Sequence, residues 1–158
     1  MSKLQEKLNG NFEEIEELDL SNRDIESIKG IGKLKNLKKL SLANTNIKDI
    51  TPLADLKKLE VLDISYCSNI QGYFVFKNLP NLKELNIVGH DIENFNELYS
   101  LKTNIGLDKL IIGMDLFDTS GFVTLKDTLF EDALSLNITT EDDKVIFDAS
   151  QKPHDVFN

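Results

Sequence analysis

Pairs of aliphatic residues separated by one other residue recur along the chain at nearly constant spacing. The five pairs are Leu18 and Leu20, Leu40 and Leu42, Leu62 and Ile64, Leu85 and Ile87, and Leu110 and Ile112. Alternate side chains of a strand point to opposite faces, so both members of a pair face the same way. A pattern with a period of roughly 22–25 residues predicts a solenoid in which each unit forms one coil.

Further apolar columns accompany the pairs. One column precedes each pair by three positions and consists of Ile15, Leu37, Leu59, Leu82 and Leu107. Four more columns follow each pair, and in the first unit they begin at Ile25, Ile28, Ile31 and Leu34. A single unit cannot bury these side chains alone. Stacked units bury them in one continuous core and align their strands in a parallel sheet.

Each unit therefore reads L-x-x-L-x-L followed by an irregular arc rich in apolar residues. The segment 40–56, LSLANTNIKDITPLADL, shows this pattern, and its neighbours repeat it. The pattern over about residues 15–117 resembles the roughly 22-residue class of leucine-rich repeats in bacterial internalins and a regulatory subunit of protein phosphatase 1. The resemblance implies an α/β fold: a right-handed solenoid with short parallel strands on its concave face, irregular or 3₁₀ convex arcs and terminal caps. It also implies binding of another protein through the concave face.

The column at the turn after each strand departs in part from the resemblance. Such repeats place Asn, Thr or Cys at this turn, buried, where the side chain satisfies backbone groups of neighbouring coils. The column here is Arg23, Thr45, Cys67, His90 and Asp115. We expect Thr45 and Cys67 to fit, and the other three to lie in irregular or partly exposed turns. Extra residues between Cys67 and Ile70, and between Leu101 and Leu107, predict bulges on the outer side.

The length of 158 residues is that of one domain. We expect residues 1–14 to form an N-terminal cap, residues 15–117 about five repeats, and residues 118–158 a C-terminal cap and tail. About 40 residues make a poor independent core, which disfavours a second domain.

Two features predict how the ends are closed. Leu4, Leu8 and Phe12, spaced by four, predict an apolar stripe over the first coil. Leu134 lies one further period beyond Leu110, so it is expected to begin a sixth strand of the sheet, with Val145–Phe147 pairing beside it.

Charge narrows the choice of partner. The net charge is −9, but residues 18–114 carry 13 Lys or Arg and 12 Asp or Glu, so the acidity lies in the flanks. Overall acidity disfavours nucleic acid and anionic membranes as partners, because both reward clustered Lys and Arg. It favours a basic protein partner. We expect the chain to be monomeric on its own.

Localisation is predicted from equally simple features. The chain contains a single cysteine, Cys67, no apolar run of about 20 residues, and a polar beginning unlike a secretory signal. These features predict a cytoplasmic protein.

The concave face is the candidate binding site. Tyr66 is its most distinctive member, because Tyr is favoured among residues that dominate binding energy. An alternative is that the tail folds back and covers Ile111 and Met114. The candidate residues are Asp19, Asn22, Lys39, Ser41, Asn44, Asp63, Tyr66, Glu84, Asn86, Val88, Ile111 and Met114.

Candidate chemistry is sparse. Gly30-Ile-Gly-Lys33 lacks the spacing of a phosphate-binding loop, and His90 beside Asp91 has no nucleophile nearby in the sequence. We expect no enzyme activity, no cofactor, no metal site and no small-molecule substrate. The predicted function is a scaffold or regulatory subunit. The alternatives are an inhibitor or immunity protein that neutralises a basic enzyme or toxin, and a surface adhesin, which would require export.

Overall fold

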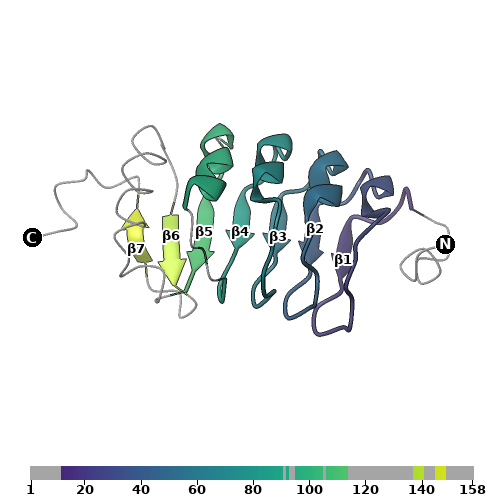
Figure 1. Ribbon diagram of the computed structural model, residues 1–158. Coiled ribbons are helices and arrows are strands. Elements are labelled where there is room, and N and C mark those ends of the chain that lie inside the picture. Colours follow the sequence, from purple (N-terminus) through teal and green to yellow (C-terminus); the bar gives the residue numbers. More distant parts are fainter. Residues whose placement is uncertain are drawn as a thin grey trace, which may run out of the picture.

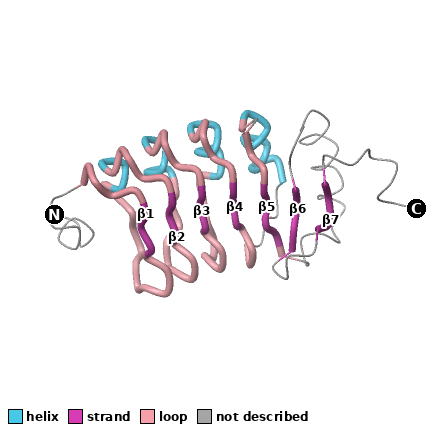
Figure 2. Tube along the Cα trace, turned by 180° about the vertical axis from the view of Figure 1, so that it is seen from behind, coloured by secondary structure: helices cyan, strands magenta, loops and turns pink. Residues whose placement is uncertain are grey.

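The chain winds into a solenoid in which each coil contributes one strand to a common sheet (Figure 1). The computed structural model describes residues 12–90, 92, 95–104, 106–113, 137–140 and 145–148. The strands are β1 (Glu17–Asp19), β2 (Lys39–Ser41), β3 (Val61–Asp63), β4 (Glu84–Asn86), β5 (Lys109–Ile112), β6 (Asn137–Thr140) and β7 (Val145–Asp148). The 3₁₀ helices are η1 (Ile31–Lys33), η2 (Thr51–Asp55), η3 (Tyr73–Asn78) and η4 (Phe95–Thr103). The helices stack in a row along one side of the solenoid (Figure 2).

The sheet follows the order of the sequence, β1 to β7, with parallel pairing from β1 to β6. Leu18 aligns with Leu40, Leu40 with Leu62, Leu62 with Leu85, and Leu85 with Leu110. These residues are the first members of the five aliphatic pairs. The predicted parallel sheet and its register are confirmed.

The aliphatic columns form one continuous core. Leu40, Leu62, Leu85 and Leu110 are buried, as are the arc residues that close behind them. The first coil is less covered, and there Phe12, Ile15, Leu18 and Ile25 are partly buried against the core. Leu4 and Leu8 lie outside the described residues. Phe12, the last member of the predicted N-terminal stripe, contacts the core as expected.

The sixth strand exists, but its predicted register is wrong. Ile138 of β6 lies opposite Leu110 of β5, so the step between these two coils is longer than any step between the preceding strands. Leu134, expected to begin this strand, lies outside the described residues. β7 pairs antiparallel with β6, which closes the sheet with a hairpin partner in place of another coil.

The two insertions are accommodated differently. The three extra residues after Leu101 accompany the longest 3₁₀ helix of the described coils, η4 with nine residues, which agrees with a bulge on the outer side. The single extra residue before Ile70 lies in the turn between β3 and η3. Asn69 there has a φ of 58°, a left-handed conformation that Asn tolerates well.

In the part of the chain that the structure describes, no helix has the length and apolar character needed to cross a membrane.

Candidate functional site

The open face of the sheet, the side opposite the core, is the face predicted to be concave. Parallel pairing in register arranges its outward side chains in rows across the coils. One row consists of Glu17, Lys39, Val61, Glu84 and Lys109. The next consists of Asp19, Ser41, Asp63, Asn86 and Ile111. A ligand on this face would therefore meet side chains at the regular strand spacing of about 4.8 Å.

Charges alternate along the edge where the strands begin. Lys38 Nζ lies 2.8 Å from a carboxylate oxygen of Glu16, and Lys83 Nζ lies 2.7 Å from one of Glu60. Hydrogen bonding to Glu16 raises the pKa of Lys38, and hydrogen bonding to Lys83 lowers the pKa of Glu60. Because Glu16, Lys38, Glu60 and Lys83 occupy successive coils, opposite charges are always neighbours. Much of the charge at this edge is therefore balanced within the protein.

The acidic residues at the other end of the strands are held by local turns. Oδ1 of Asp63 accepts hydrogen bonds from the backbone N–H and the hydroxyl of Ser65, at 2.9 and 2.7 Å. Asp19 makes the same two bonds with Ser21, and the side-chain bond is the main cause that lowers the pKa of Asp19. The ion pairs found among the described residues include neither carboxylate. Asp19 and Asp63 thus present fixed negative charge on the open face.

A column of left-handed residues follows the strands. Asn22, Asn44, Tyr66 and Gly89 have φ values of 58°, 54°, 56° and 75°. The backbone N–H groups of Asn22, Asn44 and Tyr66 each donate to a carbonyl of the next coil at 2.7–2.9 Å. The side chains of Asn44 and Asn22 are also joined, with Nδ2 donating to Oδ1 at 2.9 Å. This column fixes the edge of the open face coil by coil.

Tyr66 is the exception in this column. A bulky residue with positive φ is uncommon, whereas Asn and Gly accept this conformation readily. The Tyr66 ring lies over Gly89, and a Cβ on Gly89 would come within 2.6 Å of Cδ1 of that ring. The Tyr66 side chain remains 54% exposed. Gly89 thus provides the space in which an exposed aromatic ring is held.

The turn column beneath the open face is polar and buried. Thr45 Oγ1 donates to the Leu42 carbonyl at 2.7 Å, and Cys67 Sγ donates to the same carbonyl at 3.1 Å. His90 Nε2 lies 2.6 Å from the Ile64 carbonyl. Each side chain satisfies a backbone oxygen of its own or the preceding coil. The expectation that Thr45 and Cys67 fill this role is confirmed, whereas a partly exposed His90 is wrong, because His90 is only 3% exposed.

Tyr73 explains why His90 fits inside. Its hydroxyl lies 2.7 Å from His90 Nδ1, while Nε2 faces a carbonyl that can only accept. The ring is therefore the neutral tautomer with hydrogen on Nε2, and the Tyr73 hydroxyl donates to Nδ1. Burial lowers the pKa of His90 and raises the pKa of Tyr73. Both groups stay uncharged at neutral pH, which makes this pair part of the core.

Comparison with known proteins agrees with this geometry. A family model described as leucine-rich repeats in two copies matches residues 13–55 and again 35–73. These matched segments contain the ladder from β1 to β3. The chain has the fold of a leucine-rich repeat solenoid, and residues 13–73 match the repeats themselves. Leucine-rich repeat domains generally mediate protein–protein interaction.

Two solved structures show the same leucine-rich repeat fold. An internalin C2 of Listeria monocytogenes is 24% identical with a TM-score of 0.58, over 80% of this chain and 51% of that one. An internalin of the same species, inlF, is 23% identical with a TM-score of 0.53, over 87% of this chain and 54% of that one. The chain spans about half the length of each. No curated protein matches it.

Most of the predicted binding residues lie together on the open face of the leucine-rich repeats. Val88 is an exception: it was predicted to face a partner, but it is buried, with only 3% of the residue exposed. Ile111 is half-buried in β5, beside Thr139 of β6. Met114 lies outside the described residues. The remaining predicted residues occupy the rows and the left-handed column: Asp19, Asn22, Lys39, Ser41, Asn44, Asp63, Tyr66, Glu84 and Asn86.

The left-handed conformation of Gly89 and its contact with the Tyr66 ring were not predicted. The sequence did contain a signal for this conformation, because Gly89 aligns with Asn22 and Asn44, and both Asn and Gly tolerate a left-handed backbone.

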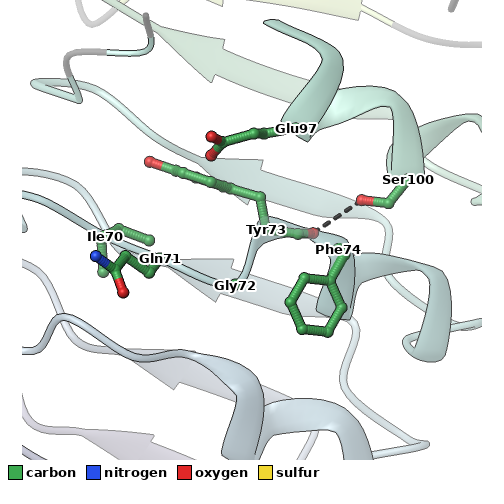
Figure 3. A pocket seen from close by; sticks show the side chains of 7 residues that line it. All are labelled: Ile70, Gln71, Gly72, Tyr73, Phe74, Glu97 and Ser100. Atoms are coloured by element: carbon green, nitrogen blue, oxygen red, sulfur yellow. Dashed lines mark hydrogen bonds between the residues drawn. The ribbon is translucent and has the colours of Figure 1, made fainter. Parts of the chain in front are cut away.

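A hollow of about 510 Å³ lies away from the open face, between η3 and η4 (Figure 3). It is lined by Ile70, Gln71, Gly72, Tyr73, Phe74, Glu97 and Ser100. The Ser100 hydroxyl donates to the Tyr73 carbonyl at 2.8 Å and so links η4 to η3. Among the described residues no group of His, Cys, Asp and Glu side chains could hold a metal ion.

Proposed function

We propose that the open face binds a protein partner, and that the chain acts as a non-catalytic scaffold or regulatory subunit. The observation that carries the proposal is Tyr66, an exposed ring held over Gly89 within an edge fixed by coil-to-coil hydrogen bonds. An aromatic side chain placed before binding loses little entropy when a partner covers it. Tyr is also enriched among residues that dominate interface energies.

The arrangement around Tyr66 supports a specific interface. Asp63 lies in the same coil and presents a fixed carboxylate, while Asn44 occupies the same column on the neighbouring coil. An aromatic centre with polar groups around it is the usual anatomy of a protein interface. Two faces of about 800 Å² each make an interface of standard size.

The test compares two single substitutions. Tyr66→Asn removes the ring but keeps a residue suited to the left-handed backbone, as Asn22 and Asn44 show. Tyr99→Asn removes an aromatic ring of similar exposure from η4, away from the open face. Partners captured from the native host by the wild-type chain are compared by quantitative mass spectrometry. A partner kept by Tyr99→Asn and lost by Tyr66→Asn supports the proposal, and retention by both contradicts it.

A second candidate function is neutralisation of a basic enzyme or toxin. It is supported by Asp19 and Asp63, whose carboxylates lie outside the ion pairs of the described residues, and by the net charge of −9. Long-range attraction of this kind accelerates association and weakens as salt screens it. Asp63→Asn is a conservative probe, because Asn86 accepts the equivalent backbone hydrogen bond in the next coil. Slower association with the captured partner and a reduced salt dependence would favour neutralisation, whereas an unchanged rate would argue against it.

A further inference from the structure

The charges of the repeats are divided between two sides of the solenoid. The outer surface is defined here as residues 28–37, 50–59, 73–82 and 95–104, which contain the 3₁₀ helices and the residues after them. It carries seven exposed lysines and only two exposed carboxylates, Asp55 and Glu97. The strands and turns, residues 15–27, 38–49, 60–72, 83–90 and 106–113, carry ten carboxylates and six Lys or Arg. The net charge of the repeats is close to zero, but their outer surface is basic.

Three lysines of the outer surface have neutral or weakly paired partners. Lys57 donates to the Asn78 carbonyl at 2.9 Å, and Lys58 donates to the Asn36 side chain at 2.6 Å. Lys35 Nζ lies 3.7 Å from Asp55, and both side chains are well exposed. Neutral acceptors orient an ammonium group but leave its charge in place. An exposed ion pair with a separation of this size is weak, so it neutralises Lys35 only slightly.

Two exposed aromatic rings accompany this charge. Phe74 of η3 is 56% exposed, and Tyr99 of η4 is 47% exposed. Lys77 Nζ lies 5.9 Å from the centre of the Phe74 ring, and Lys102 Nζ lies 5.8 Å from that of Tyr99. Cations at such distances are attracted to the ring face. Neighbouring coils thus present the same pairing of an ammonium group with an apolar ring.

A hollow adjoins the Phe74 ring. The space between η3 and η4 is bounded by the Phe74 ring on one side and by Ile70 and Gly72 on another (Figure 3). It gives an apolar side chain a place to enter against Phe74, and Glu97, which also lines the hollow, requires that the entering side chain be uncharged. Charge and shape together define a surface that suits an acidic segment carrying aromatic or aliphatic residues.

We propose that the outer surface binds an acidic segment of a partner protein, with carboxylates facing the lysines and an apolar side chain seated against Phe74. The proposal goes beyond binding by the open face and holds whether or not that face is occupied. A chain with two such surfaces can hold two partners at once. Nucleic acid is disfavoured, because the ten carboxylates of the strand side and the net charge of −9 repel a polyanion as long as a duplex.

The test uses the full chain and defined probes. A fluorescent twelve-residue peptide of Glu with two Phe residues is titrated with protein at about 50 mM salt, where screening is modest, and binding is followed by anisotropy. A matched peptide has Ser in place of Phe, and a twelve-nucleotide thymidine oligonucleotide probes nucleic acid. The variant Lys77→Glu/Lys102→Glu is compared with Arg23→Glu/Lys48→Glu, which makes the same charge change at exposed turn positions. Circular dichroism confirms that both variants are folded.

We expect the Lys77→Glu/Lys102→Glu variant to bind the Phe-containing peptide about tenfold more weakly and the control variant to change by less than about twofold. We also expect the Ser peptide to bind several-fold more weakly than the Phe peptide. Equal losses in the two double variants would show that net charge alone attracts the probe, and would overturn the proposal. Absence of binding by the wild-type chain, or tighter binding of the oligonucleotide than of the peptide, would overturn it as well.

Discussion

The hydroxyl of Tyr73 donates a hydrogen bond to Nδ1 of His90 inside the solenoid, 2.7 Å away. Tyr73 stands in an arc column that holds Ile in the first two coils, and His90 stands in a turn column that holds Thr45 and Cys67. Two polar residues in different columns therefore satisfy each other's hydrogen-bonding groups. Neither residue alone suits its position in the core.

Stability should fall as the pH is lowered below the ordinary pKa of histidine, about 6.5. Burial lowers the pKa of His90 in the folded state, so the unfolded chain takes up the proton first. The free energy of unfolding is unaffected by His90 above about pH 6.5 and falls below it, by at most about 1.4 kcal/mol per pH unit for a single proton. Urea unfolding between pH 7.5 and 5.5 measures the slope. The variant Tyr73→Ile/His90→Thr, which copies Ile50 and Thr45 of the second coil, should show a smaller slope; an equal slope would assign the effect elsewhere.

The same pair should show strong coupling. His90→Thr alone leaves the Tyr73 hydroxyl buried without its acceptor and opens space, which should cost about 2–3 kcal/mol of unfolding free energy. Adding Tyr73→Ile removes that hydroxyl and should recover about 1 kcal/mol or more. A double-mutant cycle by urea denaturation measures the coupling. Strictly additive effects would mean that the hydrogen bond contributes nothing.

Gly89→Ala should destabilise the chain in two ways. The alanine would have to adopt a φ of 75°, and its Cβ would come within 2.6 Å of the Tyr66 ring. We expect a loss of about 2–4 kcal/mol in the wild-type chain, and about 1–2 kcal/mol in a Tyr66→Asn background, where only the backbone cost remains. Chemical denaturation of the four proteins tests this expectation. An identical loss in both backgrounds would show that the ring moves aside freely.

Tyr66→Asn should be more stable than Tyr66→Ala by about 0.5–1 kcal/mol, because Asn tolerates the left-handed backbone better than Ala does. Both variants lose the packing of the ring on Gly89, so this loss does not distinguish them. Thermal unfolding compares the two variants directly. If Ala is equal or better, the left-handed conformation at position 66 costs little, and the ring is held by other means.

Lys38→Glu should make stability rise with salt. The substitution places a third carboxylate in line between Glu16 and Glu60, where the wild-type chain alternates in charge from coil to coil. All of these groups are exposed, so the change should be small and should shrink as the ionic strength increases. Melting temperatures at low and high salt measure it. A salt-independent effect would mean that Lys38 acts through packing of its aliphatic stem.

The sheet could be predicted from the sequence because the same aliphatic pattern recurs in every coil. Leu40, Leu62 and Leu85 sit in identical surroundings, so each confirms the spacing of the others. The sixth strand lacked that support. Ile138 follows Leu110 by more than one regular period and belongs to a hairpin, and a fixed period could not place it.

The site was harder to predict than the fold. His90 was expected in an irregular or partly exposed turn because its acceptor, the Ile64 carbonyl, and its donor, Tyr73, come together only through the winding of the chain. Val88 was predicted to be exposed on the open face, and this prediction is wrong, because only 3% of the residue is exposed. The basic outer surface was hidden because a sum over the repeats averages two sides that face opposite ways.

The matching registers of neighbouring strands make the coils interchangeable in geometry but not in charge. Excising residues 40–61 would join Lys39 directly to Leu62. Leu62 aligns with Leu40, so it would take the place of Leu40 after Lys39, and the remaining sheet could close over the gap. The excision would also remove Glu60 and bring Lys38 beside Lys83. Loss of two adjacent coils would preserve the alternation. Charge at this edge therefore slightly favours the gain or loss of coils in even numbers.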